Sequence, residues 1–197
     1  MRDIIETIKY KNYDINIHID EYPESPRQWD NLGTIYYCSS RYILGDKQVD
    51  RKVIQDIMND PNYFYLPVYA YIHSGVSLWT NYNTMRDHVP PSHLGWDTGM
   101  SGIIAVSKKK IRKEYTVKRV TNKLKDKIGV YLNNEIEIFN QYLNGDIYGY
   151  SVMLNGKQID SCYGYYGTNW KENGLLDSAE SEADYDNEKI KEYEGML

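Results

Sequence analysis

The chain has 197 residues, 41% of them hydrophobic and 26% charged, with a formal net charge of −5 at pH 7. Such values are typical of a folded domain, and no uninterrupted apolar run approaches the roughly 18 residues that a membrane span needs. The polar first stretch, MRDIIETIKYKNYD, does not resemble a secretory leader. We therefore expect a cytoplasmic protein without a membrane segment.

The expected elements follow from hydrophobic periodicity and from turn residues. In chain order we expect strands over 13–22 and 33–40, a helix over 49–60, a β-rich segment over 63–79, an irregular loop over 80–99, a strand over 100–107, helical structure from 108 to 143, and two strands joined at Asn155-Gly156. Ser107 is predicted to cap the helical region, Gly129 to interrupt it and Asn144-Gly145 to end it. The type I′ turn at Asn155-Gly156 predicts that Val152 faces Ile159 and that Tyr148 faces Tyr163.

This pattern predicts an α+β fold with a mainly antiparallel sheet, two or three helices, a C-terminal β-hairpin and an acidic C-terminal tail. We expect a single domain over 1–170 and a tail over 171–197 that is either solvated or docked as a helix. Cys38 and Cys162 lie far apart in the sequence, so both are predicted to be reduced and buried.

The stretch GWDTGMSG, residues 95–102, combines three glycines with an aspartate and a serine. It lacks the final glycine of a G-x-S-x-G nucleophile elbow, and its glycines do not have the spacing of a dinucleotide-binding or phosphate-binding loop. We interpret it as a tight turn into a buried strand, in which Asp97 accepts backbone hydrogen bonds and Trp96 anchors the loop.

Four histidines are the remaining candidates for chemistry: His18, His73, His88 and His93. His88 and His93 share the long loop with Asp87 and Asp97, but no spacing resembles a known metal-ligand set, so we expect neither metal nor cofactor. His73 precedes Ser74 and is a candidate general base. A small enzyme that uses the 73–97 region is therefore kept as one alternative, although we expect no enzyme.

Charge is unevenly distributed along the chain. Residues 108–127 carry a net charge of +8, and residues 171–197 carry −6. The basic segment includes Lys108, Lys109, Lys110, Arg112 and Lys113, and clustered Lys and Arg are typical of a phosphate-binding surface. The basic segment is either a nucleic-acid contact or a solvated helix face. The acidic tail over 171–197 either imitates phosphates or only improves solubility.

Several short segments resemble a family of small proteins encoded by phages and plasmids of Gram-positive bacteria. They are Leu66-Pro67-Val68-Tyr69, His73-Ser74-Gly75, Trp96-Asp97-Thr98-Gly99, Gly102, Val106-Ser107 and the stretches 142–150 and 160–167. The resemblance spans about residues 60–167 and supplies no catalytic residues. It implies an accessory protein of a mobile element, and such proteins often block a host defence complex such as a restriction or CRISPR nuclease.

The composition favours a binding protein over an enzyme. Tyrosine is unusually frequent, with 21 residues against 2 Phe and 4 Trp, and its ring and hydroxyl suit contact surfaces, although a low-GC genome gives the same excess. We expect contact with a host protein or nucleoprotein complex, and direct nucleic-acid binding through 108–127 is the alternative. The predicted contact residues outside the basic segment are Tyr163, Tyr165, Tyr166, Trp79, Trp96 and Asp97.

Overall fold

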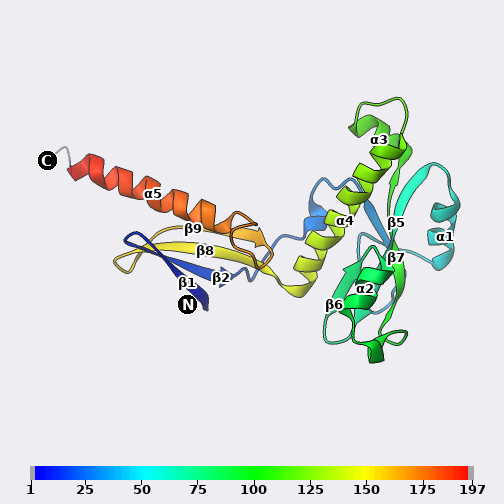
Figure 1. Ribbon diagram of the computed structural model, residues 1–197, viewed down its shortest axis with the longest axis horizontal. Helices are drawn as coiled ribbons and strands as arrows, with labels where there is room; N and C mark the ends of the chain where they lie inside the picture. The colour runs from blue at the N-terminus through cyan, green and yellow to red at the C-terminus, as the bar shows by residue number, and fades with distance from the viewer. Residues whose placement is uncertain (1–2, 195–197) are drawn as a thin grey trace. The chain divides into compact units, whose positions relative to one another are not determined.

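A computed structural model describes residues 3–194 of the chain (Figure 1). The chain divides into two compact units. Met1–Glu24 and Gly145–Leu197 form one of them, which we call the split unit, and Ser25–Asn144 form the other, which we call the central unit. This division does not coincide with the expected boundary at residue 170.

The split unit is one antiparallel sheet with a helix packed against it. Its elements are β1 (Ile4–Tyr10), β2 (Tyr13–Ile19), β8 (Ile147–Leu154), β9 (Lys157–Tyr166) and α5 (Leu175–Glu194), and the strand order is β1-β2-β8-β9. Figure 1 shows α5 running along the sheet on the side of β8 and β9. The buried core consists of residues from β2, β8 and α5: Tyr13, Ile15, Ile17, Tyr150, Val152, Leu175, Leu176, Ala179 and Ala183.

The turn between β8 and β9 lies at Asn155-Gly156, where the sequence predicted it. Both residues have positive φ, 52° and 78°, as a type I′ turn requires. The expected register is wrong, however, because irregularities in the pairing shift β9 along β8. Val152 lies opposite Asp160 instead of Ile159, and Tyr148 lies opposite Tyr165 instead of Tyr163.

The central unit is a five-stranded sheet with helices on both faces. Its elements are η1 (Pro26–Gln28), β3 (Thr34–Tyr37), β4 (Lys47–Gln48), α1 (Arg51–Asn59), β5 (Tyr63–Ile72), β6 (Val76–Trp79), α2 (Tyr82–His88), η2 (Pro91–His93), β7 (Thr98–Ser107), α3 (Lys108–Glu114) and α4 (Asn122–Asn144). The strand order is β4-β3-β7-β5-β6, with β3 and β4 parallel and the other pairs antiparallel.

The central strand β7 presents alternate residues to two separate cores. Ile104 and Val106 pack with four buried residues of α4, which are Ile128, Leu132, Ile136 and Phe139. Ile103 and Ala105 point the other way and pack with Ile54 of α1. This alternation explains why the second half of β7 is almost entirely apolar, since it is covered on both faces, and Figure 1 shows α4 and α1 on opposite sides of the sheet.

The expected fold class is therefore wrong in its architecture. Within residues 3–194 the α+β fold has two sheets with nine strands and five α-helices, and the described chain ends in α5 rather than in a hairpin and a tail. The strands β2 and β8 pair although most of the chain separates them, so no local pattern predicts the sheet of the split unit.

Two further local predictions are wrong and two are confirmed. The expected loop over 80–99 contains α2, which Asn81 caps by accepting from the backbone N–H groups of Asn83 and Thr84. The helical region is divided at residues 115–121 rather than at Gly129, which lies inside α4. Ser107 does cap α3, accepting from the Lys110 N–H at 3.1 Å, and α4 ends at Asn144 as predicted.

Cys38 and Cys162 are both free and exposed. The prediction that they are buried is wrong. Tyr37 is buried immediately before Cys38, and the period-two alternation of an extended chain then points the Cys38 side chain outward. Within residues 3–194, no helix is both long and apolar enough to cross a membrane.

Candidate functional site

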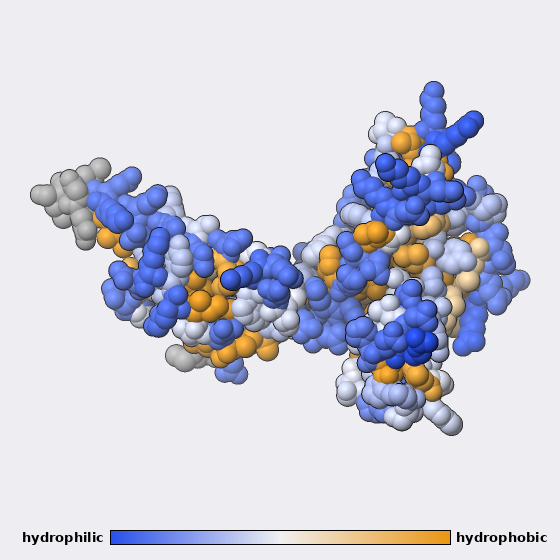
Figure 2. All heavy atoms as spheres, in the orientation of Figure 1, coloured by the Kyte–Doolittle hydropathy of each residue, from blue (hydrophilic) through white to orange (hydrophobic). Residues whose placement is uncertain are grey.

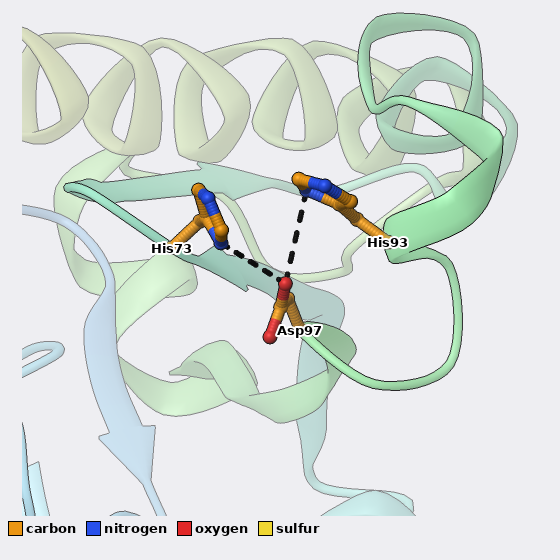
Figure 3. A group of neighbouring side chains, drawn as sticks. All are labelled: His73, His93 and Asp97. Atoms are coloured by element: carbon orange, nitrogen blue, oxygen red, sulfur yellow. Dashed lines mark hydrogen bonds and ion pairs between the residues drawn. The ribbon is translucent and has the colours of Figure 1, made fainter.

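His73, His93 and Asp97 come together at one end of the central sheet (Figure 3). Nδ1 of His73 lies 3.2 Å from Oδ2 of Asp97, and Nδ1 of His93 lies 3.7 Å from the same oxygen. The ring centroids of the two histidines are 4.5 Å apart. One carboxylate oxygen thus faces two imidazoles. We call these three residues the histidine–aspartate cluster.

Two backbone segments supply the cluster, the turn between β5 and β6 and the stretch from η2 to β7. His73 follows β5 directly, at the turn into β6, and His93 ends η2 after the adjacent prolines Pro90 and Pro91. Asp97 immediately precedes β7. Its carbonyl accepts from the N–H of Ile72 at 2.9 Å, and its own N–H donates to the carbonyl of His93 at 3.1 Å. Backbone hydrogen bonds therefore fix the position of Asp97 against both histidine segments.

Tyr71 supports both imidazole rings. Its hydroxyl lies 2.7 Å from Nδ1 of His93. Its ring is stacked parallel to that of His73, with an interplanar angle of 5° and a centroid distance of 6.1 Å. Tyr71 lies on β5 two residues before His73, so the alternation of an extended chain points both side chains to the same side, and this period is the sequence signal for Tyr71.

The predicted role of Asp97 as an acceptor for backbone amides is wrong, since its Oδ2 faces the two imidazoles instead. Thr98 performs that role, with its hydroxyl accepting from the Gly95 N–H at 2.9 Å. The other candidates of the 73–97 region do not join the cluster: Nδ1 of His88 bonds to the carbonyl of Thr84, and Asp87 pairs with Arg86.

Trp96 lies beside the cluster and is 91% exposed, so the prediction that it anchors the loop is wrong. It borders a surface hollow of about 360 Å³ that also takes in Arg41, Ile72, Met100 and Cys38. Met100 is itself 43% exposed. Trp96 and Met100 thus form an apolar rim that residues 3–194 leave open to solvent.

The other predicted aromatic contacts are more enclosed. Trp79 of β6 is half-buried, with its ring 6.3 Å from that of His88. Tyr165 packs against the core of the split unit, 5.9 Å from the ring of Tyr150, and burial raises its pKa above 10. Tyr163 lies 6.5 Å from His18, and the hydroxyl of Tyr166 donates to the carbonyl of Glu24.

The predicted basic segment lies on α3, on the start of α4 and on the connection between them. Figure 2 shows hydrophilic residues gathered over this part of the central unit. Two of the five lysines and arginines predicted as contacts are engaged locally, because the ammonium groups of Lys108 and Lys110 donate to the carbonyls of Pro61 and Asn31. The other three, Lys109, Arg112 and Lys113, are exposed.

Comparison with known proteins finds no matching family model, no matching curated protein and no matching solved structure. The residues and their surroundings in the central unit therefore carry the inference of function.

Proposed function

We propose that this chain is a non-enzymatic binding protein that acts by contact with another protein, through the surface around Trp96. The observation that carries the proposal is the 91% exposure of Trp96. Tryptophan is among the residues that contribute most to protein interfaces, because its ring buries a large apolar area with few rotatable bonds. The exposed ring of Trp96 gains no free energy from burial within residues 3–194, and a partner that covers it would supply that gain.

The surroundings of Trp96 support the proposal in two ways. The loop is held on both sides, by the hydrogen bonds of Asp97 and by the one between Gly95 and Thr98, so little conformational entropy is lost when a partner binds. The adjacent hollow, with Met100 on its rim, offers space for a side chain of the partner. Arg41 at the same hollow supplies a charged edge that would orient an acidic group.

The partner we propose is a host protein or nucleoprotein complex. The sequence resemblance to small proteins of phages and plasmids favours a defence nuclease, of the restriction or CRISPR kind, whose activity the chain would inhibit in the host cytoplasm. The tyrosines of β9 contribute less to this proposal than Trp96 does, since Tyr165 packs in the core of the split unit.

The test is affinity capture from a lysate of a Gram-positive host, with and without nuclease treatment. Trp96→Ala is compared with Tyr22→Ala, which removes an aromatic ring that is 85% exposed in the other unit. We expect the wild type and Tyr22→Ala to retain the same complex after nuclease, and Trp96→Ala to bind it about 30-fold more weakly. The captured nuclease should lose activity when wild-type protein is added. Equal binding by Trp96→Ala would show that another surface makes the contact.

Nucleic-acid binding through 108–127 is a second candidate, favoured by one observation. Within residues 3–194, the structure pairs none of the ten lysines and arginines of this segment with a carboxylate. The acidic helix α5 uses Asp184 to pair with Lys11 of the split unit. No ion pair of the described residues therefore neutralises the net charge of +8 on this segment, and this charge attracts phosphate groups.

This candidate predicts binding to labelled duplex DNA or RNA that weakens steeply with salt, by about 0.9 in log affinity per log salt for each phosphate contact. Reversing Lys109, Arg112 and Lys113 to glutamate should reduce both the affinity and the salt slope. Lys52→Glu on α1 is the control, because it changes the net charge outside the segment. If Lys52→Glu reduced the affinity and the salt slope as much as the segment substitutions do, the binding would reflect net charge and not a site on 108–127.

A further inference from the structure

We infer that the histidine–aspartate cluster binds one divalent first-row transition-metal ion, with His73, His93 and Asp97 each providing one ligand atom. The three candidate ligand atoms lie within 4.8 Å of one another. Zn²⁺ is the ion to which the site is best suited and the one used in the test below.

The spacing of the ligand atoms fits a tetrahedral ion. Two ligands at about 2.0–2.1 Å from a tetrahedral zinc ion are about 3.3 Å apart. The distances from Oδ2 of Asp97 to Nδ1 of His73 and to Nδ1 of His93 are 3.2 and 3.7 Å, on either side of that value. Figure 3 shows the three side chains pointing toward one another, so only small side-chain rotations are needed to place an ion between them.

The composition of the cluster selects the class of metal. Two imidazoles and one carboxylate suit zinc and its neighbours, whereas Mg²⁺ and Ca²⁺ prefer sites made of oxygen atoms. Three protein ligands leave a fourth position for water. The side chain of His73 is 54% exposed, so this position is open to solvent and an ion can enter directly.

A simple ion pair does not explain the arrangement as well. One imidazole is enough to pair with the Asp97 carboxylate, but here two imidazoles face the same oxygen, and their ring centroids are only 4.5 Å apart. A metal ion between them would join both rings to the carboxylate.

Tyr71 packs against both histidines of the site. Its ring lies parallel to that of His73, and packing of this kind holds a ligating ring in place. Its hydroxyl lies 2.7 Å from Nδ1 of His93, the nitrogen that faces Asp97, so a bound ion replaces this hydrogen bond. Tyr71→Phe keeps the ring and removes only the competing hydrogen bond.

The experiment is calorimetric titration of ZnCl₂ into the full chain after dialysis against a chelator. We expect about one Zn²⁺ per chain, bound at least about tenfold more weakly by His93→Ala and by Asp97→Asn, and at least as tightly as the wild type by Tyr71→Phe. His88→Ala should bind as the wild type does, since His88 is an exposed histidine of the same region that lies outside the cluster. Circular dichroism of each variant shows whether it is folded, and His73→Ala provides a further variant at an exposed position.

Cys38 lines the same hollow as Asp97 and is an exposed thiol, so the titration is repeated with Cys38→Ser. The proposal requires unchanged zinc affinity in Cys38→Ser and, with Co²⁺ in place of Zn²⁺, a visible spectrum of tetrahedral nitrogen and oxygen ligation without a thiolate band. Wild-type affinity in His93→Ala and Asp97→Asn, loss of binding in Cys38→Ser, or no zinc binding at all would overturn it. No partner enters the titration, so its result is independent of the binding function proposed for Trp96.

Discussion

The guanidinium of Arg27 lies 3.0 Å from the carboxylate of Glu135, and both side chains are more than nine-tenths buried. Arg27 also contacts Asp46 at 2.7 Å, and Glu135 accepts from the backbone N–H groups of Leu32 and Gly33 at 2.8 and 3.1 Å. This network joins η1, the segment before β3 and the middle of α4. It therefore fixes α4 to the sheet that carries the histidine–aspartate cluster.

Removal of one partner from this network should strongly destabilise the central unit. In Glu135→Leu, Arg27 keeps only the carboxylate of Asp46, and the backbone N–H groups of Leu32 and Gly33 lose their acceptor. We therefore expect the free energy of unfolding to fall by about 3–5 kcal/mol. Urea unfolding followed by tryptophan fluorescence measures it. Arg86→Ala is the control, because the pair of Arg86 with Asp87 is exposed and contributes little. Similar losses in both variants would mean that burial does not strengthen the Arg27–Glu135 pair.

Gly102 and Gly99, both on β7, should respond differently to the same substitution. A Cβ at Gly102 would lie 2.1 Å from the carbonyl oxygen of Tyr36 on β3, whereas a Cβ at Gly99 meets no described atom within 4 Å. We expect Gly102→Ala to cost at least about 1–3 kcal/mol and Gly99→Ala to stay within about 0.5 kcal/mol of the wild type. Thermal unfolding compares them, and a harmless Gly102→Ala would indicate that β3 can move away from β7.

Helix α5 should behave as part of the core and not as a solubilising tail. Ala179 and Ala183 are fully buried one turn apart on its inner face. We expect Ala183→Glu to release α5, because the new carboxylate would be buried without a partner. Hydrogen exchange at the amides of β8 would then accelerate. Glu182→Lys, at the neighbouring exposed position, should leave exchange unchanged, whereas unchanged exchange in Ala183→Glu would contradict the docking of α5.

Alkaline pH should weaken the split unit. Burial and a 2.9 Å hydrogen bond from the Tyr13 hydroxyl to Asp186 raise the pKa of Tyr13 to about 12, from an ordinary value of 10. The unfolded chain therefore loses this proton first, so the contribution of Tyr13 is complete below pH 10 and is lost between pH 10 and about 12. We expect Tyr13→Phe to show a shallower decline of stability over that interval. Urea midpoints from about pH 9 to 12 give the comparison, and parallel declines would count against a raised pKa.

Short-range features of the fold could be predicted from the sequence. Ser107 caps α3, and Asn155-Gly156 turns β8 into β9, because both structures depend on residues within a few positions of each other. The register of β9 could not be predicted, since it depends on irregularities that only the paired strands reveal. Helix α5 gives a weak pattern because alanines form part of its inner face.

The candidate site was only partly predictable. His93 and Asp97 share a short segment, and both stand out in the sequence, but the approach of His73 depends on the pairing of β5 with β7. The two-residue spacing places Tyr71 on the same side as His73, but its hydroxyl contact with His93 depends on how the 90–97 segment folds against β5. The exposure of Trp96 could not be predicted either, since a tryptophan in a glycine-rich turn more often packs inward.

The split unit takes its strands from both ends of the described sequence, with β2 paired to β8. On the ribosome, β1 and β2 therefore emerge long before β8, with which β2 pairs. At about 5–20 residues per second, the interval is on the order of ten seconds. All the strands of the central unit are contiguous within 25–144, so this unit can fold during that interval. The order of synthesis therefore allows the surface that carries Trp96 to fold before β8 is available to pair with β2.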